Sequence, residues 1–332
     1  MKKRPTIIDV AEVAGVSKST VSLVLQNSPS VKLETRKQVH AAIKETRYVY
    51  NRTAATLRGA RAGLIGLVIN DLRNPYYTEL AATVQMIFSA RGYATVIANS
   101  NEDPVIQNQV LSSMIEHGVT GLMIAPCYGG GGEIFEDIHR AAIPTLQVLR
   151  QANPRTDLFP FFSMDYDRGS YLAAEHLVQR KCRNIAFVGG VESRTITQER
   201  KGGYLRKMNE IGSNIQSFHG AADRAFGYHS ALEIAREHPQ LDAALTFNDL
   251  VALGMLAGFA EAGVKVGDSF HLVGFDDIEE AAQSFPKLSS VRCDVREFGS
   301  LTAKILLDWL ESDVIPENCV RYPVELITRA TS

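Results

Sequence analysis

The sequence predicts an all-α N-terminal head followed by an α/β body whose two lobes contain parallel sheets. Up to about residue 46 only short helical patterns occur, whereas from Leu64 onward short apolar runs alternate with longer amphipathic segments. This alternation is typical of parallel strands that helices cover on both faces. The body is too long for a single open sheet of about five or six strands, so two sheets are expected.

Composition and charge indicate a globular protein with two unlike parts. The 332 residues are 45% hydrophobic and 22% charged, which excludes a disordered chain and a small disulfide scaffold. Residues 1–61 contain 12 Lys and Arg against 4 Asp and Glu, whereas residues 62–332 contain 23 against 33. A basic end on an acidic body indicates that the N-terminal part meets a polyanion and the remainder does not.

Three helices are expected in the head. Thr6 and Asp9 have the spacing of a capping box, in which two side chains bind the unpaired amides of a helix start. Gly15 ends this first helix, and Ser17 can cap a second one. A third helix is expected over residues 34–46, where apolar residues recur on one face.

The first two helices have the pattern of a helix-turn-helix. Four valines are expected to pack between them: Val10, Val16, Val21 and Val24. The outer face of the second helix then presents Ser17, Lys18, Ser19, Ser22 and Leu23. A recognition helix presents this kind of surface to the major groove of DNA. The alternative is a helical hairpin within an all-helical subdomain, and for Leu23 the alternative is a place in the core.

A polar, basic connector over residues 49–61 joins the head, residues 1–48, to the body, residues 62–332. Its middle part, from Arg52 to Leu57, is compatible with a helix. So short a helix is marginal in isolation. We therefore expect it to form only when it has a partner.

Strands and helices alternate along the body. The expected strands cover residues 64–70, 95–99, 121–125, 145–148, 161–164, 184–188, 243–247 and 271–275. The expected helices cover residues 77–90, 166–180, 198–211, 225–237 and 249–261. Ligands of parallel sheets bind beyond the carboxyl ends of the strands, so the ligand site is expected in the cleft between the lobes.

Several motifs resemble the lac repressor (LacI) family of bacterial transcriptional regulators. In the head and connector they are Asp9-Val-Ala-x-x-Ala-Gly-Val-Ser-x-x-Thr-Val-Ser22 and Asn51-Arg-x-Ala-x-x-Leu57. In the body they are Ile65-Gly66, Asn74-Pro-Tyr-Tyr-x-Glu79, Asp165, His176-Leu177, Asn248-Asp249, Gly274-Phe-Asp-Asp277 and Pro286-x-Leu288. The resemblance implies a homodimer that binds operator DNA through its heads. It also implies a body of the type I periplasmic-binding-protein fold that binds a small effector.

Carried over by position, the resemblance assigns the contacts with DNA. Base edges are assigned to Lys18, Ser19 and Leu23, and phosphates to Thr6, Ser17, Ser22 and Gln26. Thr20 and Asn51 complete the predicted DNA-binding set. Lysine can donate to guanine, whereas leucine can touch only a thymine methyl group. Hydroxyl and amide groups bond phosphate oxygens without reading sequence.

The resemblance also gives the connector a role. In the family it folds into a hinge helix only on DNA, paired with its twin, and a leucine enters the minor groove. Leu57 matches that leucine, and Ala54 beside it allows the two helices to approach closely. An apolar wedge of this kind kinks the duplex. Tyr50 departs from the proline that the family often has before Asn51, and this departure bears on the rigidity of the hinge entry.

Three polar residues match the family's effector-contacting Asp, Asn and Arg, namely Asp276, Asn248 and Arg200. A carboxylate accepts from adjacent hydroxyls, a guanidinium donates in a planar fork and an amide does both, which suits a sugar. The alternative for an Asp at a strand end is a helix N-cap. We assign that role to Asp249 and Asp277.

Aromatic and basic residues extend the predicted effector set. Tyr76 and Tyr77 match positions where the family stacks rings on its effector, with core packing as the alternative. Arg194 matches a position that sometimes contacts the effector, and Arg150 can reach the cleft. These two arginines also admit an anionic or phosphorylated effector. Leu149 and Ala222 stand where relatives place polar or large aromatic side chains, so no relative's ligand can simply be copied.

We therefore expect a homodimeric transcriptional regulator, a repressor that a sugar or sugar derivative releases from an inverted-repeat DNA operator. Within this class, the alternative is a corepressor-dependent regulator with a purine-like or anionic effector. From a different class, the alternative is a solute-binding protein or a sugar enzyme on the same body fold. The cleft residues supply binding groups without a nucleophile, base or metal set. We thus expect no catalytic residue, no metal and no cofactor.

The sequence also bears on location. Asp9 and Glu12 interrupt any apolar region of a secretory leader, and no apolar run is long enough to cross a bilayer. The four cysteines show no paired spacing, which favours unpaired thiols in a reducing compartment. A cytoplasmic protein that does not enter a membrane is expected.

Overall fold

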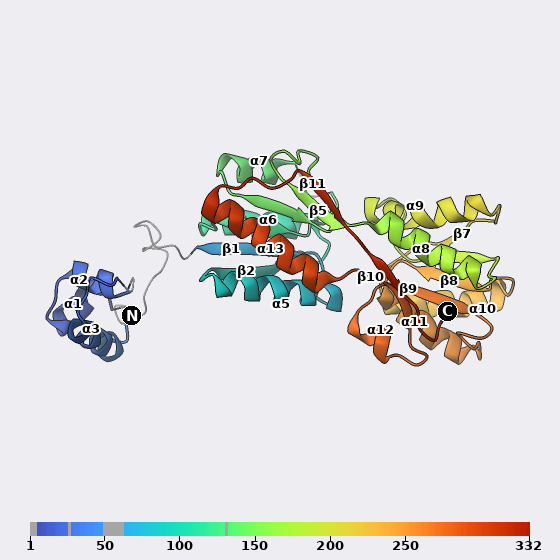
Figure 1. The fold of residues 1–332 in the computed structure, drawn as a ribbon, viewed down its shortest axis with the longest axis horizontal. Coiled ribbons are helices and arrows are strands. Elements are labelled where there is room, and N and C mark those ends of the chain that lie inside the picture. Colours follow the sequence, from blue (N-terminus) through green and yellow to red (C-terminus); the bar gives the residue numbers. More distant parts are fainter. Residues whose placement is uncertain (1–4, 26–27, 49–62, 130–131) are drawn as a thin grey trace. The chain divides into compact units, whose positions relative to one another are not determined.

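The computed structural model describes residues 5–25, 28–48, 63–129 and 132–332. The chain divides into two compact units, Met1–Gly63 and Leu64–Ser332. Figure 1 shows both. Within the described residues, the helices are all too short or too polar to cross a bilayer.

The head consists of α1 (Ile7–Ala14), α2 (Lys18–Leu25) and α3 (Leu33–Thr46). Thr6 and Asp9 form the predicted capping box at the start of α1, and Gly15, with φ of 63°, ends it. Ser17 Oγ accepts from the amide of Thr20 at 3.1 Å and so caps α2. A small core holds the three helices together through Val10, Val21, Val24, Val39 and Ala42, all of them buried.

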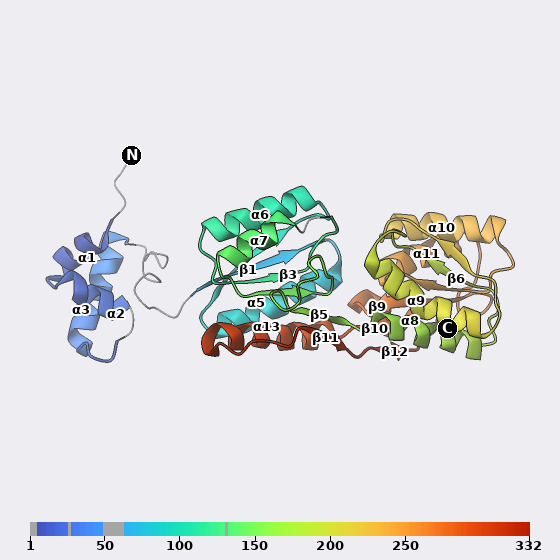
Figure 2. The same cartoon turned by 90° about the horizontal axis from the view of Figure 1, so that it is seen from above.

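The N-lobe of the body contains a six-stranded parallel sheet with the order β11-β5-β4-β3-β1-β2. Its strands are β1 (Leu64–Ile69), β2 (Ala94–Asn99), β3 (Gly121–Ile124), β4 (Thr145–Val148), β5 (Phe161–Met164) and β11 (Cys319–Tyr322). One face is covered by α5 (Pro75–Ala90) and α13 (Val295–Ser312), and the other by α6 (Pro104–Glu116) and α7 (Glu133–Arg140) (Figure 2). The central strands β3, β4 and β5 are buried throughout.

The C-lobe contains a second six-stranded sheet with the order β12-β10-β9-β8-β6-β7. Its strands are β6 (Ile185–Val188), β7 (Gln216–Phe218), β8 (Ala243–Thr246), β9 (His271–Asp276), β10 (Ser289–Arg292) and the antiparallel β12 (Glu325–Ile327). Its helices are α8 (Tyr166–Gln179), α9 (Thr195–Glu210), α10 (Arg224–Glu237), α11 (Asp249–Glu261) and the short α12 (Glu279–Gln283). The pair α8 and α9 lies on one face, and the pair α10 and α11 on the other (Figure 2).

The chain passes between the lobes three times (Figure 1). It crosses from β5 to α8, returns from β10 to α13, and crosses again from β11 to β12. The last helix of the N-lobe and its edge strand β11 therefore come from a late part of the sequence. The crossings leave the carboxyl ends of β5, β10 and β11, so these ends are directed toward the other lobe.

The predicted fold class is confirmed. Each predicted body strand and helix is present, and every boundary lies within three residues of the prediction. The prediction missed β7, β10, β11 and β12, as well as α6, α7, α12 and α13. The four cysteines are unpaired, and only Cys319 is exposed.

Candidate functional site

The outer face of α2 carries the predicted DNA-reading side chains. Ser17, Lys18 and Ser19 are exposed, whereas Thr20 and Ser22 are half-buried. Leu23 is 38% exposed, so it does not take the place in the core that was its alternative. The hydroxyl of Ser17 lies 2.7 Å from that of Ser19 and 2.8 Å from that of Thr20. These contacts hold the side chains at the start of the helix together.

Thr6 is engaged in capping α1. Its hydroxyl donates to Asp9 Oδ2 at 2.7 Å and accepts from the amide of Asp9 at 3.4 Å. Since a hydroxyl has a single proton to donate, Thr6 can donate to a phosphate oxygen only by giving up its bond to Asp9. The other predicted DNA contacts, Gln26, Asn51, Ala54 and Leu57, lie outside the described residues, as does the whole predicted hinge helix.

Strained backbone gathers where the strands end at the cleft. Five non-glycine residues there have positive φ: Asn101 (51°), Glu102 (59°), Leu149 (65°), Asp276 (112°) and Asp277 (56°). Such conformations are uncommon for residues with a side chain and tend to cluster at functional sites. Ligand-binding groups are therefore expected at the ends of β2, β4 and β9.

Arg200 and Asp276 form a buried ion pair in the C-lobe. Arg200, in α9, donates from Nη2 to Asp276 Oδ1 at 2.8 Å and from Nη1 to the carbonyl oxygen of Phe247. Its guanidinium lies 4.7 Å from the ring centroid of Tyr166, 4.8 Å from that of Phe247 and 4.2 Å from that of Phe275. These distances are within cation–π range. Arg200 Nε is buried and has no hydrogen-bond partner among the described residues.

The electrostatics of this pair follow from its burial. Burial raises the pKa of Asp276, against the opposing charges of Arg200 and Arg150. Burial by itself would lower the pKa of Arg200, but Asp276 and Tyr166 raise it above its usual value. We treat both groups as ionised, because opposite charges 2.8 Å apart in a buried site stabilise one another.

A second cluster of charges connects the two lobes. Arg150, which follows β4, donates from Nη1 to both oxygens of Glu102, at 2.7 and 2.9 Å. Arg194 of the C-lobe donates to Glu102 Oε2 at 3.4 Å. The ring of Tyr128 lies beneath both guanidinium groups, with centroid distances of 5.2 Å to Arg150 and 5.6 Å to Arg194. The hydroxyl of Tyr128 accepts from the amide of Ile196 at 3.0 Å, which adds another contact between the lobes.

Tyr76 and Tyr77 lie in the first turn of α5. Asn74 caps this helix by accepting from the amide of Tyr76, and Pro75 takes its first position, where a missing N–H does no harm. Both tyrosines are at least nine-tenths buried. The hydroxyl of Tyr76 has no hydrogen-bond partner among the described residues, and burial raises its pKa well above the usual value. The Tyr77 ring centroid lies 6.0 Å from the guanidinium of Arg150.

Asn248 caps α11, which corrects the assignment of this cap to Asp249. Its Oδ1 accepts from the amide of Val251, so Asn248 rather than Asp249 caps α11. Its Nδ2 donates to the carbonyl oxygen of Ala222 at 3.0 Å. An amide retains one proton and one lone pair beyond these two bonds. Asn248 can therefore still contact a ligand.

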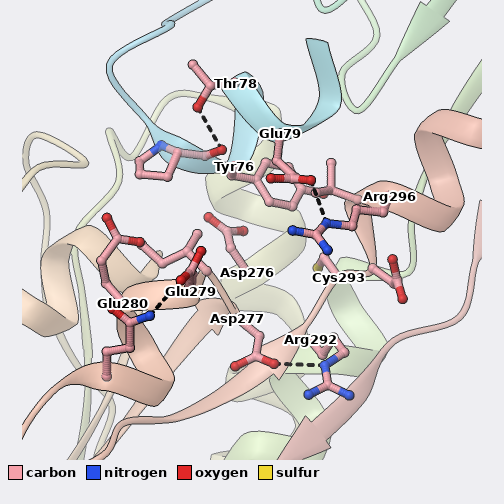
Figure 3. Close-up of a pocket in the computed structure, with 15 residues that line it drawn as sticks. Tyr76, Thr78, Glu79, Asp276, Asp277, Glu279, Glu280, Arg292, Cys293 and Arg296 are labelled. Atoms are coloured by element: carbon pink, nitrogen blue, oxygen red, sulfur yellow. Dashed lines mark hydrogen bonds and ion pairs between the residues drawn. The ribbon is translucent and has the colours of Figure 1, made fainter. Parts of the chain in front are cut away.

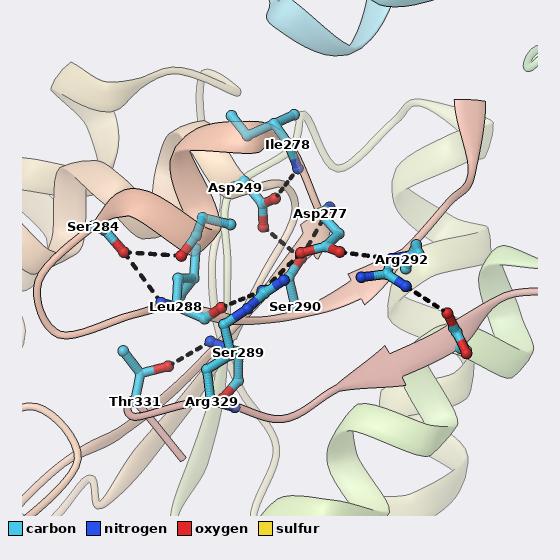
Figure 4. Close-up of polar contacts among 12 residues, drawn as sticks. Asp249, Asp277, Ile278, Ser284, Leu288, Ser289, Ser290, Arg292, Arg329 and Thr331 are labelled. Atoms are coloured by element: carbon cyan, nitrogen blue, oxygen red, sulfur yellow. Dashed lines mark hydrogen bonds and ion pairs between the residues drawn. The ribbon is translucent and has the colours of Figure 1, made fainter. Parts of the chain in front are cut away.

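Asp249 and Asp277 belong to a buried polar network instead of capping helices (Figure 4). Asp249 accepts from the amide of Ile278 at 2.9 Å and from Ser290 Oγ at 2.6 Å. Asp277 pairs with Arg292 at 2.8 Å and with Arg329 at 2.7 Å. Ile278 precedes α12 without a side-chain cap. The network fixes the turn after β9 and with it the neighbouring Asp276.

One cavity of the body opens beside Tyr76 and Asp276 (Figure 3). It has a volume of about 820 Å³, within the usual range for small-molecule sites. Its walls come from the start of α5, the turn after β9, and the crossing segment that contains Arg292 and Cys293. Two arginines in the wall are paired, Arg292 with Asp277 and Arg296 with Glu79.

A smaller cavity of about 230 Å³ lies beside Arg150 and Tyr128. Leu149 lines it, and Ile196 and Glu199 close its C-lobe side. The predicted effector residues are thus divided between two cavities. Tyr76 and Asp276 line the larger one and Arg150 the smaller one, while Tyr77, Arg194, Arg200 and Asn248 line neither.

Three residues of this site were missed from the sequence: Glu102, Tyr128 and Tyr166. Each follows the carboxyl end of a strand, β2, β3 or β5 respectively. The position just beyond a strand end, where ligands of parallel sheets bind, is the signal in the sequence that points to all three.

Comparison with known proteins covers both units. Residues 6–51 match the family model of bacterial regulatory proteins of the lacI family, and residues 174–332 match that of the periplasmic binding protein-like domain. The chain is 32% identical to the maltose regulon regulatory protein MalI of Escherichia coli K12, over 80% of this chain and 78% of that protein. It is 28% identical to the ribose operon repressor of Halalkalibacterium halodurans, over 98% and 97%. Among solved structures, the lac repressor dimer bound to operator and the anti-inducer ONPF superposes with a TM-score of 0.86 at 26% identity, over 99% of both chains.

Proposed function

This chain belongs to the lacI family of bacterial regulatory proteins and is a DNA-binding regulator of transcription, and from that premise we propose that it is a repressor which a small effector releases from its operator. The exposed face of α2 carries the proposal. Lys18, Ser19 and Leu23 are turned outward while the valines of the same helix fill the core of the head. This separation leaves a side-chain surface available to base edges.

We assign the parts of the chain accordingly. Residues 1–48 bind DNA, residues 49–61 form the hinge and residues 62–332 bind the effector and dimerise. Base edges are read by Lys18, Ser19 and Leu23. Leu57 enters the minor groove, and Ala54 allows the two hinge helices to approach closely. Thr20 and Asn51 complete the DNA-binding set, and the phosphate contacts are Thr6, Ser17, Ser22 and Gln26. Of these, Thr6 has the weakest support because its hydroxyl proton is already bound to Asp9.

A homodimer is supported by an exposed apolar edge of the N-lobe. Strand β2 ends the sheet order, so one side of its backbone has no neighbouring strand. Val96 and Ile97 are each 40% exposed on it, and Met86 of α5 is 65% exposed. A two-fold dimer presents two heads and therefore binds an inverted-repeat operator.

A sugar or sugar derivative is the effector that the cleft supports best. Its buried donors, Arg200 and Tyr76, lie with the acceptor Asp276 among aromatic rings. Rings against the faces of a sugar and polar groups against its hydroxyls are a suitable combination. Ligand binding that changes lobe closure would shift the paired hinges away from DNA. By linkage, operator would then weaken effector binding to the same degree.

One alternative is kept. A corepressor-dependent regulator with a purine-like or anionic effector is favoured by the extra arginines, Arg150 and Arg194.

The proteins to which the chain is similar are transcription regulators rather than enzymes. We propose likewise that the chain binds its effector without catalysis and acts in the cytoplasm, where its operator would be. Sustained product formation from a candidate sugar in a turnover assay would refute the binding-only role.

The decisive experiment is a selection of random duplexes by the purified protein at near-physiological salt, followed by sequencing of the bound pool. An inverted repeat with a central pyrimidine–purine step is the expected outcome, because such steps kink easily. The selected duplex then serves to screen sugars for operator release. Tightening by a nucleobase, with no sugar causing release, would favour the corepressor model. A pool without enrichment, with and without a mixture of metabolites, would refute sequence-specific binding.

A further inference from the structure

Glu102 stands in the cleft at the point where two arginines converge. It belongs to the turn that follows β2, where both Asn101 and Glu102 have positive φ. Asn70 Nδ2 donates to Glu102 Oε1 at 2.7 Å, and the amide of Glu102 donates to the carbonyl oxygen of Asn70 at 3.0 Å. A disfavoured backbone conformation held by two hydrogen bonds thus directs this carboxylate toward the arginines.

The carboxylate provides the counter-ion for a buried guanidinium. Arg150 is 7% exposed, and a charge so buried is very costly without a partner. Both oxygens of Glu102 accept from Arg150 Nη1, and Oε2 also faces Arg194. An anionic ligand group directed at these two arginines would meet a negative charge already in place. The pair formed by Arg200 and Asp276 is balanced in the same way.

Three buried polar atoms without a hydrogen-bond partner in the described part of the chain favour a ligand that carries hydroxyl groups. Arg150 Nε, Arg200 Nε and the hydroxyl of Tyr76 are buried and have no hydrogen-bond partner among the described residues. Two of these atoms can only donate, and the tyrosine hydroxyl can donate or accept. Ligand hydroxyls both accept and donate and add no net charge, so they suit the unpartnered atoms of Tyr76 and Arg150, which line the larger and the smaller cavity respectively.

We propose that Glu102 is an internal counter-ion that sets the charge class of the effector, so that the cleft binds an uncharged, hydroxyl-bearing ligand and excludes phosphorylated or carboxylated ones. This inference rests on the proposed effector-binding function. It also decides between the neutral and the anionic effectors that the sequence left open. Glu102 is a specificity-determining residue, because its removal leaves Arg150 and Arg194 available to an anion.

The test uses the full chain and inorganic phosphate as the probe. Phosphate binding is measured by calorimetry and thermal unfolding for the wild type, for Glu102→Gln, and for the control Glu311→Gln. Glu311, in the last turn of α13, pairs at 2.6 Å with Arg91, which follows α5, and neither residue lines the two cavities. Sodium chloride at matched ionic strength corrects for screening. The basic head is common to all three proteins, so a difference between them reports on the cleft.

Glu102→Gln is expected to bind phosphate at least tenfold more tightly than the wild type and the control, and adding Arg194→Gln should reverse the gain. Equal phosphate affinity for Glu102→Gln and the wild type would overturn the proposal.

If Glu102→Gln fails to fold, the comparison of phosphate binding by the wild type and by Arg194→Gln decides the proposal. Saturable phosphate binding by the wild type that Arg194→Gln abolishes overturns the proposal, and unchanged weak binding in both proteins supports it. The duplex selection separately tests the regulator function on the wild type, so the two failures are distinguishable.

Discussion

At the scale of single residues, the cleft consists of arginines that are buried together with their counter-ions. Arg150 and Arg200 are 7% and 4% exposed, and each faces a carboxylate as well as aromatic rings. Leaving either guanidinium buried without its carboxylate would be destabilising. Glu102 and Asp276 are therefore needed for folding as well as for recognition. Stability and effector response should change together when they are replaced.

Asp276→Asn is expected to lower the free energy of unfolding by about 3–5 kcal/mol, because it leaves the buried charge of Arg200 without its partner. Urea unfolding followed by circular dichroism measures this loss, and effector-dependent operator release should disappear with it. The matched control is Asp157→Asn, whose partner Arg155 is exposed, and its unfolding midpoint should stay near that of the wild type. Similar midpoints for the two variants would contradict the buried pair.

The buried carboxyl of Asp249 predicts a pH dependence of stability. Burial raises the pKa of Asp249 well above its usual value, and the nearby Asp276 adds to the shift. The folded chain then binds a proton that the unfolded chain releases at about pH 4, so this contribution to stability is lost as pH rises through the folded pKa. Between about pH 4 and 7 the wild type should lose more stability than Asp249→Asn, which cannot ionise. Urea unfolding across this range measures the difference. If the free energies of unfolding of the wild type and of Asp249→Asn changed in parallel with pH, the pKa of Asp249 would not be raised.

At the scale of elements, the sequence was most informative where strands are buried and helices are amphipathic. The strands over 145–148 and 161–164 were predicted to the residue because they are short, fully buried runs. Strands β11 and β12 were missed because they contain exposed polar residues such as Arg321 and Glu325. These strands form only because a sheet edge is already present beside them.

The site, like the fold, could be predicted from the sequence only in part. Arg200 and Asp276 could be placed at the cleft, because residues at the carboxyl ends of strands share one edge of a sheet. The ion pair between Glu102 and Arg150 could not be predicted. It joins the turns after β2 and β4, and these strands are separated by β1 and β3 in a sheet order that only the folded chain shows.

The capping box of α1 gives a prediction at this scale. Thr6→Ala should destabilise the head by about 1 kcal/mol, the usual cost of losing an N-cap, whereas Thr6→Ser should retain the cap. Thermal unfolding of the full chain, followed through the transition of the head, measures the effect. If Thr6 serves only as a cap, operator affinity at a temperature where the head is folded stays the same in both variants. A loss of affinity for Thr6→Ala on operator and non-specific DNA alike would instead reveal a direct phosphate contact.

At the scale of the whole molecule, the exposed edge strand β2 connects assembly to DNA binding. Exposed apolar edges invite pairing with another chain, and Val96 and Ile97 place such a surface on the body. An operator with two half-sites binds a dimer far more tightly than a single head, because the second head then binds at a high effective concentration. Loss of the dimer should therefore reduce operator affinity even though the head is unchanged.

Ile97→Lys is expected to give a monomer in sedimentation velocity at micromolar concentration and to weaken operator binding at least tenfold. The lysine introduces a charge that would be buried between two subunits at an unfavourable cost. Val314→Lys alters a residue that is 57% exposed in the loop after α13 and should remain dimeric. A dimer in both variants would move the interface away from β2.

The three passages of the chain between the lobes also govern the order in which a newly made chain can mature. On the ribosome the N-terminal residues emerge first, and domains usually fold as they appear. Here the N-lobe needs α13 and β11, and the C-lobe needs Thr331, whose hydroxyl accepts from the amide of Ser289 and whose carbonyl oxygen accepts from the amide of Leu272. Neither lobe can close its core until the late residues have been synthesised. Among the described parts of the chain, the three helices of the head have their own core by residue 48 and can fold early, so a ribosome stalled midway would display a folded recognition helix on an unfinished sensor.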